Sequence, residues 1–174
     1  MTHDFFDNND GPRLLVSEHE AGHVVVALAL GMEVVSVSID DQQTVCDGAF
    51  FAAMPENASQ AAMFCFGGMI YEQILAGLYT DDPRPIPPAR EYGSGDIAEA
   101  YRFADMLNDG NATSETMGRL MSMVIEILHA NLQATNAMAR DLQRRRRLTG
   151  LEVHELWDLH GGQLAALEPV VDLT

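Results

Sequence analysis

The pattern of apolar and polar positions predicts a helix near the start of the chain, over residues 13–30. Its second half, residues 24–30, is apolar at nearly every position, and Gly31 ends the run. A helix that lacks a polar face is expected to be buried on most of its sides. Residues 1–12 are acidic and polar, so we expect a flexible lead ahead of this helix.

A small sheet is predicted after the first helix, because the apolar positions begin to alternate with polar ones. Val35, Val37 and Ile39 are separated by serines within residues 33–40, which is the two-residue period of a strand. A second apolar segment with two phenylalanines, 48–53, follows a polar turn. We therefore expect a hairpin in which Val35, Val37 and Ile39 share one face.

The third predicted element is an apolar helix over residues 57–76. Asn57 is followed three residues later by Gln60, a spacing that resembles a capping box. Gly67-Gly68 lies in the middle of this helix, where two glycines weaken helix propensity. Close packing against another backbone is the expected compensation.

The remaining chain is predicted to be helical apart from a proline-rich loop. Further expected elements are the loop at 77–95, a helix over 96–107, one or two helices over 113–148 with a break within 131–136, and a last short helix opened by a capping box of Thr149 and Glu152. The sequence thus predicts a mainly α-helical (α+β) domain over residues 13–174, with a small sheet or hairpin after the first helix.

Length and charge narrow the classes of function. A chain of 174 residues fits one domain with a single core. Its formal net charge of −16 argues against general binding to nucleic acid, because phosphates would be repelled. The longest apolar run, 24–32, is about half of the roughly 20 residues that span a bilayer. We expect no membrane partner, no secretory signal and a cytoplasmic location.

One short motif points to metal chemistry, His19-Glu20-Ala21-Gly22-His23. Histidines four positions apart share a face of a helix, so both imidazoles can bind one Zn²⁺. Glu20 flanks the metal without having to bind it, and can activate a water molecule there. The same five-residue pattern also occurs by chance in proteins that are not peptidases. Burying two histidines and a glutamate without a metal would be costly, which favours the zinc site.

A catalytic zinc normally takes three protein ligands, so one more residue is needed. Asp96 follows Gly93-Ser94-Gly95 and opens a predicted helix. Glu72 lies in the helix that follows the glycine pair. Asp96 could instead cap its helix, and Glu72 could form a surface salt bridge. Spacing alone leaves both residues as candidates for the third ligand.

Five short segments, taken in their order along the chain, resemble segments of a known protein family. These are His19-Glu20-Ala21-Gly22-His23-Val24-Val25, Val35-Ser36-Val37-Ser38-Ile39, Phe66-Gly67-Gly68-Met69-Ile70-Tyr71-Glu72-Gln73-Ile74, Gly93-Ser94-Gly95-Asp96-Ile97 and Leu148-Thr149-Gly150-Leu151-Glu152-Val153. With them, roughly residues 13–156 resemble the peptidase domain of the FtsH-type ATP-dependent zinc metalloproteases. The resemblance implies a zincin-like helical domain that hydrolyses peptide bonds, with Glu20 as the catalytic residue.

The same resemblance implies Asp96 as the third zinc ligand beside His19 and His23, and leaves Glu72 as a supporting residue. The family also carries an ATPase module, but this sequence has no phosphate-binding glycine loop with a lysine. We therefore expect unfolded or peptide-sized substrates, with a homo-oligomer or a separate ATPase as candidate partners. The alternative is a non-catalytic zinc-binding regulatory or adaptor protein derived from such a peptidase.

Two further expectations concern the surface. By analogy with zincins in general, an extended substrate could add to the edge of the strand at 33–40. Arg144 to Arg147 form a basic run that could touch an acidic partner. We interpret this run as a solvated helix end, where the helix dipole favours positive charge.

Overall fold

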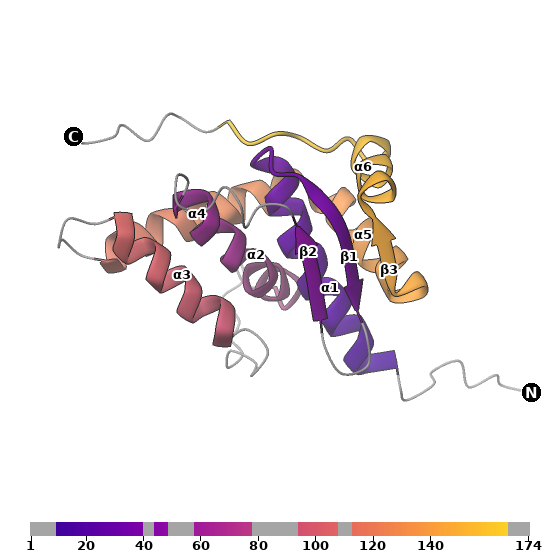
Figure 1. The fold of residues 1–174 in the computed structure, drawn as a ribbon, viewed down its shortest axis with the longest axis horizontal. Coiled ribbons are helices and arrows are strands. Elements are labelled where there is room, and N and C mark those ends of the chain that lie inside the picture. Colours follow the sequence, from indigo (N-terminus) through magenta and orange to yellow (C-terminus); the bar gives the residue numbers. More distant parts are fainter. Residues whose placement is uncertain (1–9, 40–43, 49–57, 78–93, 108–112, 167–174) are drawn as a thin grey trace, which may run out of the picture.

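The computed structural model describes residues 10–39, 44–48, 58–77, 94–107 and 113–166. This part of the chain is mainly helical with one small antiparallel sheet, as the sequence predicts (Figure 1). The elements are α1 (Asp10–Ala29), β1 (Val34–Ile39), β2 (Thr44–Gly48), α2 (Ala58–Leu75), α3 (Ser94–Leu107), α4 (Thr113–Ala130), α5 (Leu132–Arg145), β3 (Arg147–Thr149) and α6 (Gly150–Leu159).

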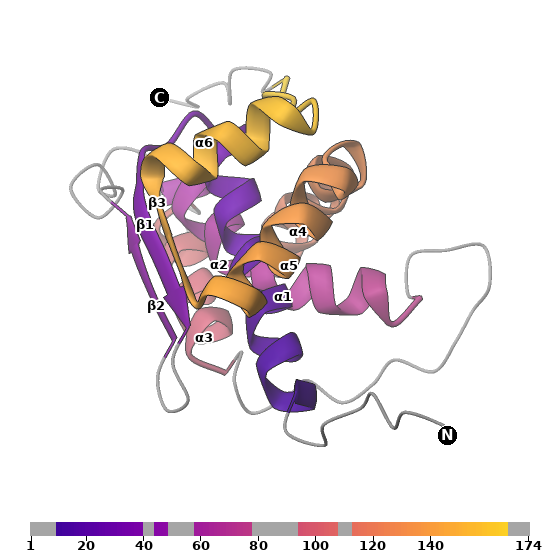
Figure 2. The ribbon, with the colours of Figure 1, turned by 90° about the vertical axis from the view of Figure 1, so that its right-hand side faces the viewer.

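The helices lie on one side of the sheet, which is seen almost edge-on in Figure 2. α1 runs behind β1 and β2 in Figure 1, and its apolar second half, 24–29, is buried along its whole length. α2 is buried on nearly all sides as well, as expected for helices without a polar face. Among the described residues, no helix combines the length and apolar character needed to cross a membrane.

β1 is the central strand of the sheet, whose order is β2-β1-β3, with both neighbours antiparallel to it. Both of its edges are therefore occupied. The expectation that an extended substrate adds to the edge of this strand is wrong, because β2 and β3 already take up its hydrogen bonds there.

The face pattern of β1 also departs from the predicted alternation. Val37 and Ile39 are buried, but Val35 is 54% exposed and Ser36 is buried. The register with β2 shifts between Val34 and Ser36, which marks a bulge. A bulge inserts one extra residue into a strand and so moves the side chains beyond it to the other face.

The partners of β1 lie elsewhere than the sequence pattern predicts. β2 occupies Thr44–Gly48, which covers the second half of the expected polar turn at 40–47 and the first residue of the expected second strand at 48–53. Residues 49–53 lie outside the described residues. β3 was not expected. It is a three-residue strand whose Leu148 pairs with Val37 of β1. Strands this short are defined by their pairing partner rather than by their own composition.

The helix ends agree better with the sequence. α4 and α5 are separated at Asn131, within the predicted break, and Thr149 and Glu152 form the predicted capping box at the start of α6. α1 starts at Asp10, earlier than the expected residue 13. Asn57, most of the loop at 77–95 and the first nine residues of the expected lead lie outside the described residues.

Candidate metal centre

α1 and α2 cross at two glycines, and this crossing positions the candidate site. A Cβ atom on Gly67 would lie 2.7 Å from the carbonyl oxygen of Gly22, so the two backbones are in direct contact. The sequence predicts such a close approach for the glycine pair in α2. His19 and His23 flank Gly22 on the helix and consequently face α2 at short range.

Three side chains from two helices converge beside this crossing. The Nε2 atoms of His19 and His23 lie 2.9 Å apart. Oδ2 of Asp96, in the first turn of α3, lies 3.2 Å from Nε2 of His19 and 3.5 Å from Nε2 of His23. Among the described residues these three form the group of side chains that could hold a metal ion.

The distances fit a small tetrahedral metal ion. With metal–ligand bonds of about 2.0–2.1 Å, neighbouring ligand atoms in a tetrahedron are roughly 3.3 Å apart. The three measured separations of 2.9, 3.2 and 3.5 Å lie on both sides of this value. Two imidazole nitrogens and one carboxylate oxygen are also a donor set that Zn²⁺ prefers, and three protein ligands leave its fourth position open.

The second nitrogen of each imidazole has its own partner. Nδ1 of His23 donates to the main-chain carbonyl oxygen of Phe64 at 2.7 Å, because a carbonyl can only accept. Nδ1 of His19 lies 3.0 Å from Oε1 of Glu72. Partners of this kind hold the rings in place and direct the Nε2 lone pairs toward a metal.

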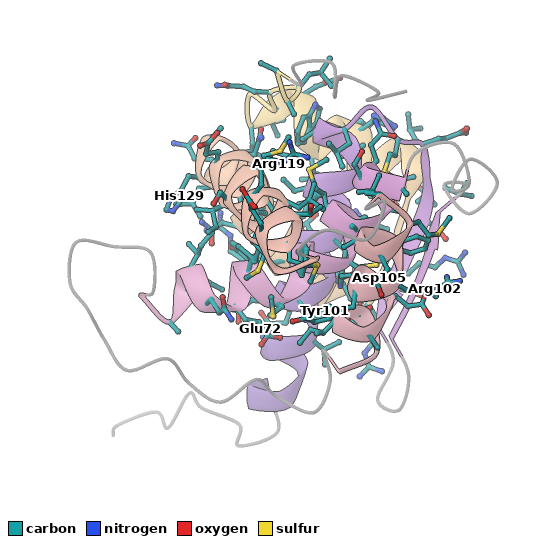
Figure 3. The ribbon with its side chains drawn as sticks, turned by 90° about the vertical axis from the view of Figure 1, so that its left-hand side faces the viewer. Glu72, Tyr101, Arg102, Asp105, Arg119 and His129 are labelled. Carbon is teal, nitrogen blue, oxygen red and sulfur yellow. The ribbon has the colours of Figure 1, made fainter. Side chains whose placement is uncertain are left out.

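Glu72 therefore contacts the edge of His19 that faces away from the cluster. This geometry bears on the choice between Asp96 and Glu72, which spacing alone left open. Asp96 lies within reach of both Nε2 atoms, whereas Glu72 reaches only the far nitrogen of His19. Figure 3 views the face on which α3 lies and labels Glu72 on α2.

Hydrogen bonds within the cluster shift the pKa values of His19 and Asp96. Burial by itself would lower the pKa of His19, but hydrogen bonds to Asp96 and Glu72 outweigh burial and raise the pKa to about 9. Burial would likewise raise the pKa of Asp96, but hydrogen bonds with the two histidines hold it well below its usual range. In the absence of a metal, a proton on His19 thus provides the positive charge that the carboxylates favour.

The site is buried on the side of α1 and meets solvent at α3. His19 and His23 are 7% and 4% exposed, whereas the Asp96 side chain is 35% exposed. A molecule entering from solvent would therefore reach the cluster past Asp96.

Glu20 is a buried carboxylate next to the first histidine. It is only 5% exposed, and its charge contributes to the raised pKa of His19. Among the described residues, the Glu20 carboxylate has no hydrogen-bond or ion-pair partner, and it does not belong to the three-residue cluster. A buried carboxylate that stays available for proton transfer is what the sequence motif predicts for this position.

Two contributors to the site were not expected from the sequence. Gly68 leaves the space that the His19 ring occupies, since a Cβ atom there would lie 2.6 Å from Nε2 of His19. The glycine pair was a visible signal, but it pointed only to backbone packing. Phe64 acts through its main-chain carbonyl oxygen, for which no side-chain pattern gives a signal.

A cysteine also lies near the cluster, in α2. Cys65 is free and buried, and burial together with the negative charge of Asp96 raises the pKa of its thiol to about 12. Such a thiol stays protonated at neutral pH and is a poor nucleophile. The chemistry of the site therefore rests on the histidines and carboxylates.

Comparisons with known proteins assign the chain to no family. No protein-family model matches its sequence, and no curated protein matches it.

Proposed function

We propose that the protein is a zinc-dependent metallopeptidase. The observation that carries the proposal is the convergence of His19, His23 and Asp96 at separations that suit a tetrahedral ion, with Glu20 buried beside them. The resemblance of the sequence motifs to FtsH-type peptidase domains supports the same assignment. Zinc, bound by these three residues, would supply a Lewis acid that polarises a water molecule and the scissile carbonyl group.

Other residues of the chain would transfer the proton and hold the metal ligands in position. Glu20 accepts a proton from the attacking water and passes it to the nitrogen of the leaving amine. One water molecule is consumed, the C–N bond breaks, and a carboxylate and a protonated amine are released. Glu72 and the Phe64 carbonyl group keep the two imidazoles in the orientation that metal binding requires.

The proposed substrate class rests on the resemblance to peptidase domains. Unfolded polypeptides or peptides are the proposed substrates, with a homo-oligomer or an ATPase as the candidate assembly. The alternative function is a zinc-binding regulatory or adaptor protein without hydrolytic activity.

The proposal is tested by removing and restoring the metal. Protein stripped with a chelator should not cleave unfolded casein, and stoichiometric zinc should restore cleavage without ATP. Restoration by zinc in the wild type but not in His23→Gln supports a zinc peptidase at this cluster. Cleavage that persists in fully metal-free protein would contradict the proposal. Zinc binding without cleavage of casein or of a peptide library would favour the adaptor alternative.

A further inference from the structure

A second candidate site lies between α5 and α6, which face the viewer together in Figure 2. A pocket with a volume of about 320 Å³ opens there. Its lining combines three side chains that carry or can carry positive charge, one carboxylate and an apolar floor, from Arg140, Arg144, His160, Asp141, Ala137 and Leu156. α3, which carries Asp96, lies on the opposite side of the molecule in Figure 1.

Half of the arginines of this acidic protein lie in or next to the helix segment that lines the pocket. The chain has ten basic residues, all of them arginine, against 26 acidic ones. Five of these arginines fall within residues 140–147, along the last turns of α5 and into β3. Two of these five, Arg140 and Arg144, line the pocket itself.

The arginines of the pocket are only weakly engaged within the chain. Arg144 is 73% exposed and contacts Asp141 of the same helix at 3.0 Å, an arrangement that contributes little in water. Arg140 is exposed, and its guanidinium group makes no hydrogen bond or ion pair with the described residues. In contrast, Arg145 outside the pocket pairs with Glu152 of α6. The pocket thus presents guanidinium groups that can still bind an external anion.

We propose that this pocket binds an acidic segment of a separate polypeptide, one in which carboxylate side chains alternate with apolar ones. Arg140 and Arg144 are spaced one helical turn apart and would each contact a carboxylate. Ala137 and Leu156 would contact the apolar side chains between them. The run at 144–147 would then be more than the solvated helix end that its sequence indicates.

The lining favours a peptide over a nucleic acid. Asp141 lies inside the pocket, where it repels each added negative charge, so a contiguous row of phosphates is opposed more than carboxylates spaced by neutral side chains. A net charge of −16 also opposes the approach of a long polyanion, but a short segment with a few carboxylates carries less charge. The apolar floor matches side chains of a peptide and has no counterpart on a phosphodiester backbone.

The test is fluorescence anisotropy with a labelled peptide of alternating glutamate and leucine. The wild type should bind it, and binding should weaken as salt increases. Arg140→Glu and Arg144→Glu should each lower the affinity by about tenfold or more, because a charge-assisted contact is lost and a repulsion added. The matched control is Arg119→Glu, the same charge change at an exposed arginine of α4, on the face seen in Figure 3. It should change the affinity by less than about twofold.

Several outcomes would overturn the proposal. These are equal weakening by Arg119→Glu, equal binding of a peptide with glutamine in place of glutamate, and displacement of the peptide by inorganic phosphate or by an oligonucleotide. A concentration-dependent dimer that Arg140→Glu abolishes would assign the pocket to a second copy of the chain and also contradict it. Zinc affinity, measured on the same variants, should stay at the wild-type value. Loss of peptide binding therefore cannot be confused with damage to the metal centre.

Discussion

Gly68 faces the imidazole of His19 so closely that a Cβ atom at this position would lie 2.6 Å from the ring. The two residues belong to different helices, and the ring is held from its other sides by Glu72 and Asp96. A glycine in the middle of α2 is therefore part of the geometry of the metal centre.

Replacing this glycine should impair metal binding. In Gly68→Ala the added methyl group displaces a ring that other contacts hold in place, so zinc affinity should fall by roughly tenfold or more. Competition with a chromophoric zinc chelator measures the change. Wild-type affinity in a folded Gly68→Ala protein would show that the ring position is not critical.

Replacing the neighbouring glycine, Gly67, should lower the stability of the folded protein. Gly67 touches the Gly22 backbone, which cannot move aside as a side chain can, so Gly67→Ala should destabilise the protein by about 1–3 kcal/mol. Gly118 in α4 provides the control, since its Cβ position is open. Gly118→Ala should stabilise by about 0.5–1 kcal/mol through helix propensity. Urea unfolding of both variants checks the contrast, and destabilisation of equal size would rule out the packing explanation.

Glu72 should act on the metal through His19. Glu72→Gln keeps the shape of the side chain but removes the charge that orients and polarises the ring, and zinc affinity should fall by about 10- to 100-fold. Glu99 of α3 is an exposed carboxylate that pairs with Arg102, so Glu99→Gln is a suitable control with little expected effect. If Glu72→Gln binds zinc as tightly as the wild type, Glu72 does not contribute to metal binding.

The metal-free protein should lose stability as the pH rises through the neutral range. The pKa of His19 is about 9 in the folded protein and 6.5 in its ordinary state. Between these values the folded state holds a proton that the unfolded state has released, so the free energy of unfolding should fall with pH. The stabilisation is complete below pH 6.5 and is lost as the pH passes 9.

Urea unfolding across this pH range, with zinc removed, measures the slope. The slope should disappear in His19→Gln and persist in His154→Gln, which changes an exposed histidine of α6. The same proton competes with the metal, so the apparent zinc affinity of the wild type should rise over the same range. A free energy of unfolding that does not vary with pH would contradict the raised pKa.

The helices and the two histidines could be predicted because their signals are local. The capping box of Thr149 and Glu152 uses residues three apart, and His19 and His23 share a face by helical spacing alone. The break at Asn131 falls within the interval 131–136 that the sequence predicts. Each of these features depends on the conformation of one short segment.

The strands and the surroundings of the histidines depend on partners far along the chain. β2 and β3 are located by pairing with β1, and the bulge that turns Val35 outward arises in that pairing. Asp96 and Glu72 could be named as candidates from the sequence, but their positions on opposite edges of the His19 ring follow from the packing of α2 on α1 and of α3 on α2. The Phe64 carbonyl group had no sequence signal at all.

The most direct test of the account compares zinc binding and casein cleavage in the wild type, Glu20→Gln and Asp96→Asn. We predict that Glu20→Gln binds zinc as the wild type does but cleaves no casein, whereas Asp96→Asn loses zinc affinity and cleavage together. This separation would assign proton transfer to Glu20 and metal binding to the cluster. Cleavage by Glu20→Gln at the wild-type rate, with zinc bound, would contradict the account.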